Sequence, residues 1–146
     1  MPDDALHAVF VRSAIARGHI RQIEVEAARA APNIIAVLTA DDTARDNISN
    51  MVWTGSPVRD DGLTGVESQR PLLSGSVIRH LGEPICMIVG RTRQSAMDAA
   101  ELINISYEAD EEVALTLGEL EGPLVWPGSP DNIASLHVLG DKVAVE

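Results

Sequence analysis

The apolar and polar positions of this chain follow different periods along its first 110 residues. Residues 6–12 and 19–25 alternate, which predicts two half-buried strands. Residues 34–38 and 85–89 are instead short uninterrupted apolar runs rich in β-branched side chains, and such runs are typical of strands buried on both faces. Pro84 can begin the later strand, because a proline has no N–H to donate to a sheet.

Helical spacing is clearest over residues 92–103, where Thr92 is suited to cap the N-terminus. The apolar face of this predicted helix consists of Ala96, Ala99, Ala100 and Ile103. Because most of these side chains are small, we expect the helix to pack closely on a sheet. A shorter helical turn is expected at residues 27–31 and a last strand at residues 103–107, and residues 113–120 leave room for another short helix.

Two segments have no regular period. From residue 43 to residue 69 we expect a long loop that is the most mobile internal part of the chain. Trp53 lies in this loop and would pack either on the domain itself or against a partner. Residues 126–146 carry too many aliphatic side chains for a free tail in water, so we expect them to be poorly anchored or to pack on a second copy of the chain. A homodimer is therefore one expected outcome.

The order strand, strand, helix, strand, loop, strand, helix, strand predicts an α+β (mixed α/β) fold, with a mixed sheet and a few packed helices. A length of 146 residues is sufficient for one domain with a real core. Aromatic residues make up only 3% of the chain, so this core must consist of Val, Ile, Leu, Ala and Met.

Four motifs occur in an order that matches a known family. They lie at residues 6–20, 32–42, 70–90 and 92–107. The first contains Leu-His-Ala-Val-Phe-Val-Arg-Ser, the second Ile-Ile-Ala-Val-Leu-Thr, and the third leads from Arg-Pro-Leu to Gly-Glu-Pro. Together they resemble the α/β-hammerhead domain that begins the molybdenum-binding large subunit of the xanthine dehydrogenase and aldehyde oxidase (molybdenum hydroxylase) family. The resemblance covers most of residues 5 to 110.

This resemblance implies an α/β-hammerhead domain at residues 1–125, followed at 126–146 by a linker that crosses toward a cofactor-binding domain. The parent enzyme would be an oxidoreductase that hydroxylates a carbonyl or N-heterocyclic carbon with a molybdopterin cofactor. Its implied partners are the downstream molybdenum-binding domains, together with iron–sulfur and FAD modules or subunits. In that family the catalytic groups belong to later domains, so the isolated chain is expected to be inactive and to bind no molybdenum.

The residues themselves show no catalytic, cofactor-binding or metal-binding pattern. The histidines, His7, His19, His80 and His137, are far apart and lack ligand spacing. No nucleophile elbow, dinucleotide fingerprint or phosphate loop is present. Cys86 lies inside an apolar run, where cysteine usually behaves as a small hydrophobe. Arg12, Glu83 and the Trp53 loop are the positions expected to meet a partner, although Glu83 would equally serve the turn at Gly82.

A net charge of −11 disfavours binding to nucleic acid or to an anionic membrane surface. The sequence has no apolar stretch of about 18 residues, so we expect no membrane span and no signal peptide, and a cytoplasmic location. The leading interpretation is a non-catalytic hammerhead domain of a molybdenum hydroxylase. The alternative is a stand-alone binding or interaction module with the same fold. The substrate of a parent enzyme is not visible in these residues.

Overall fold

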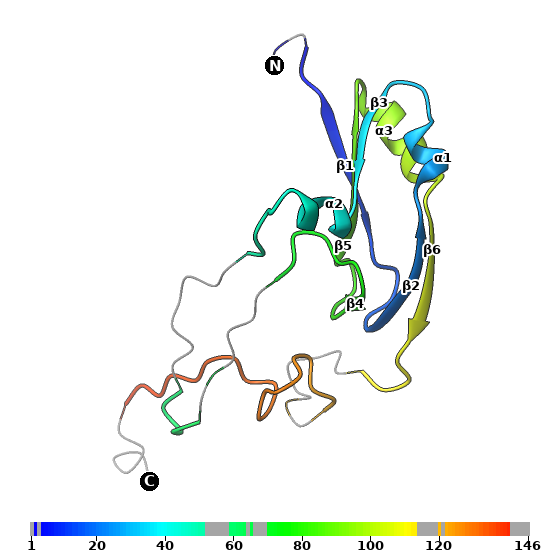
Figure 1. Cartoon of the computed structure of the whole chain (residues 1–146). Helices are drawn as coiled ribbons and strands as arrows, with labels where there is room; N and C mark the ends of the chain where they lie inside the picture. The colour runs from blue at the N-terminus through cyan, green and yellow to red at the C-terminus, as the bar shows by residue number, and fades with distance from the viewer. Residues whose placement is uncertain are drawn as a thin grey trace. The chain divides into compact units, whose positions relative to one another are not determined.

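The computed structural model describes residues 2, 4–51, 59–63, 65, 70–113, 120 and 122–140. The chain forms two compact units, one made of Met1–Met51 and Pro71–Val113, the other of Val52–Arg70 and Ala114–Glu146. All the helices and strands labelled in Figure 1 belong to the first unit.

The first sheet consists of β1 (His7–Arg12), β5 (Pro84–Gly90) and β3 (Ile34–Leu38), in the order β1-β5-β3 with antiparallel neighbours. The central strand β5 is mostly buried, but Met87 and Val89 on one of its faces are only partly buried, so the predicted burial of residues 85–89 on both faces is confirmed for one face alone. The same prediction was wrong for residues 34–38. In β3 only Val37 is buried and Ile35 is 48% exposed, because β3 lies at the edge of the sheet.

The second sheet consists of β4 (Val77–Ile78), β2 (Gly18–Glu24) and β6 (Asn104–Ala109), again antiparallel. The sequence did not predict β4, because two residues are too few to show a period. Gly18 has a φ of +147°, and a Cβ atom there would lie 2.2 Å from the carbonyl oxygen of Glu108. Glycine is therefore required where β2 meets β6.

Three short helices complete the first unit: α1 (Glu26–Arg29), α2 (Ala40–Arg45) and α3 (Arg93–Ala100). The predicted cap of α3 is confirmed, since Thr92 Oγ1 accepts a hydrogen bond from Ser95 N at 3.0 Å. The helix α2 was not predicted from the sequence, which indicated only the start of a loop at residue 43. Most of the suggested helix at residues 113–120 lies outside the described residues. Among those described, no helix is long and apolar enough to cross a membrane.

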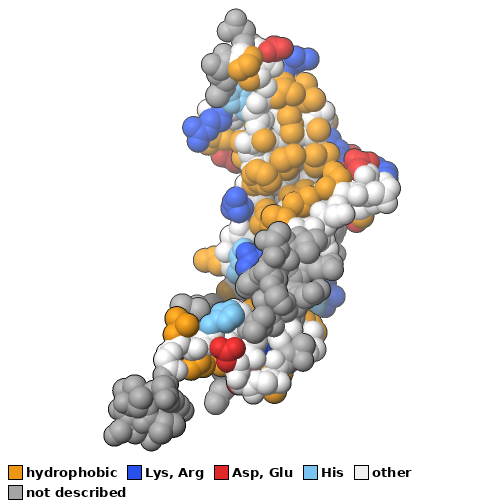
Figure 2. All heavy atoms as spheres, turned by 90° about the vertical axis from the view of Figure 1, so that its left-hand side faces the viewer, with side chains coloured by type: hydrophobic (Ala, Val, Ile, Leu, Met, Phe, Trp, Pro, Cys, Tyr) orange, Lys and Arg blue, Asp and Glu red, His pale blue; other side chains and the backbone are white. Residues whose placement is uncertain are grey.

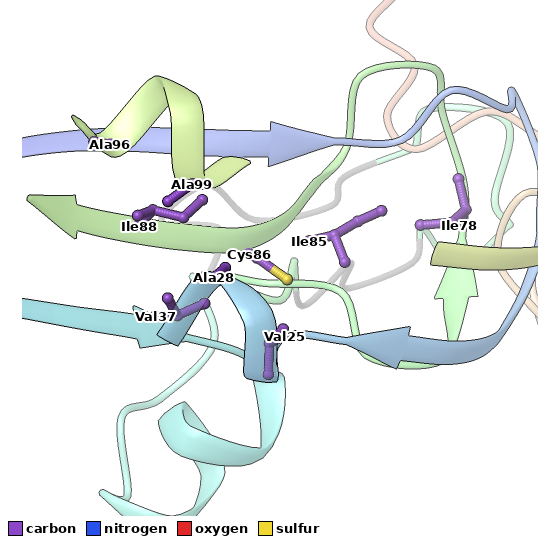
Figure 3. Close-up of a cluster of buried hydrophobic side chains, with 9 residues drawn as sticks. All are labelled: Val25, Ala28, Val37, Ile78, Ile85, Cys86, Ile88, Ala96 and Ala99. Atoms are coloured by element: carbon purple, nitrogen blue, oxygen red, sulfur yellow. The ribbon is translucent and has the colours of Figure 1, made fainter. Parts of the chain in front are cut away.

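One apolar core joins the two sheets and the helices α1 and α3 (Figure 3). Its buried members are Val25, Ala28, Val37, Ile78, Ile85, Cys86, Ile88, Ala96 and Ala99. The small side chains of Ala96 and Ala99 are fully buried, which allows α3 to approach the first sheet closely, as predicted. The α+β class is confirmed, and the described strands form two antiparallel sheets rather than one mixed sheet.

The second unit is organised around the buried guanidinium of Arg59, whose side chain is 1% exposed. It donates two hydrogen bonds to the carboxylate of Asp131, at 2.6 and 2.9 Å, and two to that of Asp61, at 3.1 and 2.6 Å. Arg59 Nη1 also donates to the carbonyl oxygen of Ile133 at 2.9 Å, and Asp60 N donates to the carbonyl oxygen of Leu136 at 3.0 Å. These bonds connect two segments about 70 residues apart in sequence.

The expectation of a poorly anchored C-terminal segment is therefore wrong for its described part near Asp131. The homodimer stays a prediction, and Leu139, which is 96% exposed, keeps apolar surface available for it. The domain boundary between residues 125 and 126 also stays a prediction.

Replacing Ile88 with Ala should lower the free energy of unfolding by about 2–5 kcal/mol, because Ile88 is fully buried and its loss leaves a cavity. The matched control is Ile35→Ala on the neighbouring edge strand, which should cost less than about 1 kcal/mol because Ile35 is half exposed. Urea unfolding of both variants measures the difference. Equal costs at the two positions would contradict the assignment of β5 as the core strand.

The contact around Arg59 should be sensitive to acid. Hydrogen bonds from Arg59 lower the pKa of both Asp61 and Asp131 from the ordinary value of 3.8. Such carboxylates stabilise the folded state above that value, and the stabilisation disappears as the pH falls through the lowered pKa. Amide protection of residues 129–138 should therefore persist from about pH 7 to about pH 5 and be lost only below pH 3.8.

Hydrogen exchange, corrected for the intrinsic rates at each pH, measures this dependence. Arg59→Met is the control, and it should remove the protection at every pH because it leaves two carboxylates without their cation. Protection that is already lost between about pH 7 and about pH 5 would contradict the role given to these carboxylates.

Candidate functional site

Glu83 lies at the junction before β5 and is only 5% exposed. Its carboxylate accepts two short hydrogen bonds, from Ser74 Oγ to Oε1 and from Arg79 N to Oε2, both at 2.6 Å. Ser74 is itself buried, and its N–H donates to the carbonyl oxygen of Pro84 at 2.8 Å. A buried carboxylate with two donors is well satisfied. Glu83 thus holds residues 74–79 against the start of β5.

The backbone of the same junction connects β5 to the end of β1. Ser13 N donates to the carbonyl oxygen of Glu83 at 2.8 Å, and Gly82 N donates to the carbonyl oxygen of Ser13 at 3.0 Å. Gly82 has a φ of +79°, which a side chain would disfavour. Arg12 Nη1 donates to the carbonyl oxygen of Gly82 at 3.0 Å, and its guanidinium lies 5.6 Å from the centroid of the Phe10 ring.

The three positions singled out from the sequence have different places in the structure. Arg12 and Glu83 meet at the Gly82 turn, as two parts of one hydrogen-bonded junction. Glu83 was expected either to meet a partner or to stabilise the turn at Gly82, and the contacts of its carboxylate favour the turn. Trp53 lies outside the described residues. Sequence reasoning missed Arg59 and Ser74, because no local pattern marks an arginine or a serine as buried.

A groove of about 860 Å³ lies beside β3 and is lined by α1, α2 and the edge of the strand. Arg29 contacts Glu26 at 2.9 Å and Asp42 at 3.2 Å, and Arg45 contacts the other oxygen of Asp42. Burial acts to raise the pKa of Asp42, but hydrogen bonds from Thr39 and Arg45 outweigh it and lower that pKa. These charges neutralise one another, so the groove has the character of a solvated edge rather than of a binding site.

The described residues do not provide a ligand set for a metal or a molybdenum cofactor. Within this part of the chain, no group of three or more His, Cys, Asp or Glu side chains is placed to hold a metal ion. Cys86 is fully buried, and burial raises the pKa of its thiol to about 11. It therefore stays protonated at neutral pH and serves as a core side chain, as predicted.

Comparison with known proteins identifies the fold family. A family model described as "Aldehyde oxidase and xanthine dehydrogenase, a/b hammerhead domain" matches residues 1–111. The chain belongs to this family. The resemblance proposed from the four motifs is thereby confirmed, together with the hammerhead fold. The matched residues include the Glu83 junction and all the helices and strands of the first unit.

Individual relatives agree with this assignment. The chain is 30% identical over 142 residues to the large subunit of nicotine 6-hydroxylase from Paenarthrobacter nicotinovorans, covering 90% of this chain and 15% of the relative. It is 32% identical over 104 residues to the xanthine dehydrogenase molybdenum-binding subunit of Escherichia coli O157:H7, and the match covers 70% of this chain and 13% of the relative. The solved structure of quinoline 2-oxidoreductase from Pseudomonas putida 86 matches with a TM-score of 0.68 and 33% identity. This match covers 81% of this chain and 14% of the solved chain.

The homologues are thus large or molybdenum-binding subunits of multi-subunit molybdenum enzymes. This chain spans only 13% to 15% of the length of these two curated relatives. The comparisons therefore assign the hammerhead domain to this chain.

Replacing Glu83 with Ala should lower the free energy of unfolding by about 2–4 kcal/mol, because it leaves the buried Ser74 hydroxyl and Arg79 N–H without an acceptor. Glu112→Ala is the control, since Glu112 is exposed, and its cost should stay within about 0.5 kcal/mol. Chemical unfolding of both variants checks the expectation. A Glu83→Ala variant as stable as the control would show that the carboxylate does not hold the junction.

Proposed function

We propose that this chain serves as the N-terminal hammerhead domain of a molybdopterin-dependent oxidoreductase and is non-catalytic by itself. The observation that carries the proposal is the family match over residues 1–111, in a chain that covers 15% or less of its molybdenum-binding relatives. In this role the domain supplies a rigid structural part of the large subunit, and the molybdenum site is built by other segments of that subunit.

The polar contacts of the first unit support a structural role. Both carboxylate oxygens of the buried Glu83 accept hydrogen bonds from donors within the same unit. The charges beside β3 pair with one another. Side chains that are already bonded within the domain are suited to holding its shape, whereas catalysis needs groups that remain available to a substrate.

The parent reaction would be hydroxylation of a carbonyl or N-heterocyclic carbon, with molybdopterin in the large subunit and iron–sulfur and FAD groups in partner modules, in the cytoplasm. Relatives with this domain are named for substrates as different as nicotine, xanthine, aldehydes and carbon monoxide. Because one domain type accompanies such different substrates, we propose that the hammerhead domain does not select the substrate.

The alternative function is a stand-alone binding or interaction module with the same fold. One observation favours it: Arg59 and Asp131 join the two separate segments of the second unit, so the chain supplies internal partners for its own C-terminal part. Exchange of this domain into a relative distinguishes the two functions.

The test replaces the aligned segment of the nicotine 6-hydroxylase large subunit with this chain. The 142 aligned residues define the exchange. We expect the chimeric subunit to assemble with its partner subunits and to retain molybdenum, because the domain's structural role is common to the family. A large subunit with the same segment deleted is the control, and it should fail to assemble. Molybdenum content and size-exclusion chromatography are the measurements.

Two outcomes would count against the proposed function. If the deleted subunit assembles as well as its parent, the domain has no structural role there. If the deletion abolishes assembly and the chimera does not restore it, the stand-alone module becomes the better function. The isolated chain, purified without any partner, should in either case show no hydroxylase activity and no stoichiometric molybdenum.

A further inference from the structure

The sheet β1-β5-β3 has two unlike faces. Its inner face carries Val9, Ile88 and Val37 in one register row, packed against the core and beside α3. Side chains alternate between faces along a strand, so the neighbouring residues lie on the outer face. The apolar residues of this outer face are Ala8, Phe10, Ala36, Leu38, Met87 and Val89. Arg12, at the end of β1, follows Phe10 on the same face.

The register arranges these outer side chains in two continuous rows. Phe10 lies opposite Met87, which lies opposite Leu38. The second row has Val89 at its centre, between Ala8 and Ala36. None of the six belongs to the core or to the partly buried residues packed against it, and Phe10 is 43% exposed. Figure 2 shows apolar side chains gathered on the open surface over the upper part of the first unit.

The charge around this face is unusual for so acidic a chain. None of the residues of β1, β3 or β5 is acidic, although the chain carries a net charge of −11. Arg12 extends from β1 on the same side as Phe10, and its guanidinium lies over the Phe10 ring. Among the ion pairs of the described residues, none involves Arg12. A partner surface that complements this face therefore has an apolar centre and a carboxylate opposite Arg12.

The size of the face distinguishes two possible partners, a second copy of the chain and another domain of the same polypeptide. Three strands at a spacing of about 4.8 Å, each about six residues long at about 3.3 Å per residue, cover roughly 300 Å². A stable complex of two free proteins usually buries about 800 Å² on each partner, so this face alone is too small for a stable dimer of the chain. Contacts between domains of one polypeptide can be smaller, because the connection raises their effective concentration.

The geometry points to one assignment: the outer face of β1-β5-β3 is the surface by which this domain docks onto the molybdenum-binding part of the large subunit. The docked surface has apolar side chains against Phe10, Met87 and Val89 and a carboxylate near Arg12. This inference rests on the proposed function and adds to it the face and the chemistry of its partner.

The test uses the chimeric nicotine 6-hydroxylase large subunit and places a charge on the apolar face. Phe10→Lys should reduce the yield of assembled, molybdenum-containing enzyme by roughly tenfold or more, because the apolar contact would have to bury an ammonium group. Lys is tolerated on an exposed edge strand, so the isolated variant should keep its melting temperature. The matched control is Met97→Lys on α3, where the side chain is 42% exposed and the added charge is the same.

A second variant tests the rim. Arg12→Glu should weaken assembly in the chimera, and the loss should be partly relieved at high salt, because like charges would then face each other. In each case the melting temperature of the isolated domain separates a docking defect from a folding defect. If Phe10→Lys melts early, Arg12→Glu carries the test, since Arg12 is exposed at the rim.

The outcomes distinguish a failure of the docking-face assignment from a failure of the proposed function. If the unmodified chimera assembles and the Phe10→Lys and Met97→Lys forms assemble equally well, the face assignment is wrong and the proposed function stands. If the unmodified chimera fails, the proposed function fails and the assignment falls with it. If the isolated chain is a dimer that Phe10→Lys dissociates, the occupant is a second copy, which overturns the assignment.

Discussion

The first sheet depends on how the chain enters its central strand, and a single buried carboxylate controls that entry. Glu83 is a charged residue at the edge of an apolar core, and burial of a carboxylate is costly unless donors are supplied. Ser74 Oγ and Arg79 N supply them. Meeting that requirement brings residues 74–79 beside β5 and places the Gly82 turn against Ser13 at the end of β1.

Once β5 is placed, the rest of the first unit follows from its two edges and its two faces. β1 pairs with one edge and β3 with the other, so the strand between them is the one most fully buried. Its inner face is covered by α3, whose Ala96 and Ala99 permit close approach. On its outer face, Met87 and Val89 are apolar and belong neither to the core nor to the residues packed against it. The sheet therefore has one face that completes the domain and one that is available to a partner.

This asymmetry is consistent with a domain that occupies a small part of a large subunit. A domain that folds around its inner face alone can be joined through its outer face to segments that hold the cofactor. The relatives share the domain while differing in the substrates for which they are named. Such a division separates the part that provides shape from the parts that provide chemistry. The hydrogen-bonded carboxylate of Glu83 and the paired charges beside β3 agree with the first role.

The local pattern of the chain by itself determined most of its elements. The apolar run ending at Val89, the Thr92 cap and the alanine face of α3 each depend on residues close together in sequence, so periodicity and capping chemistry were enough to find them. The four motifs determined the family for the same reason, since they are read in order along the chain.

Only the tertiary structure decided which of two similar apolar runs is central. β3 and β5 look alike in sequence, but β5 has a partner on both sides and β3 has one. It also decided that Glu83 serves the turn, that Arg59 is buried, and that Asp131, 72 residues away, neutralises it. Strand neighbours and ion-pair partners are chosen in space between residues far apart in the chain, and no local period records that choice.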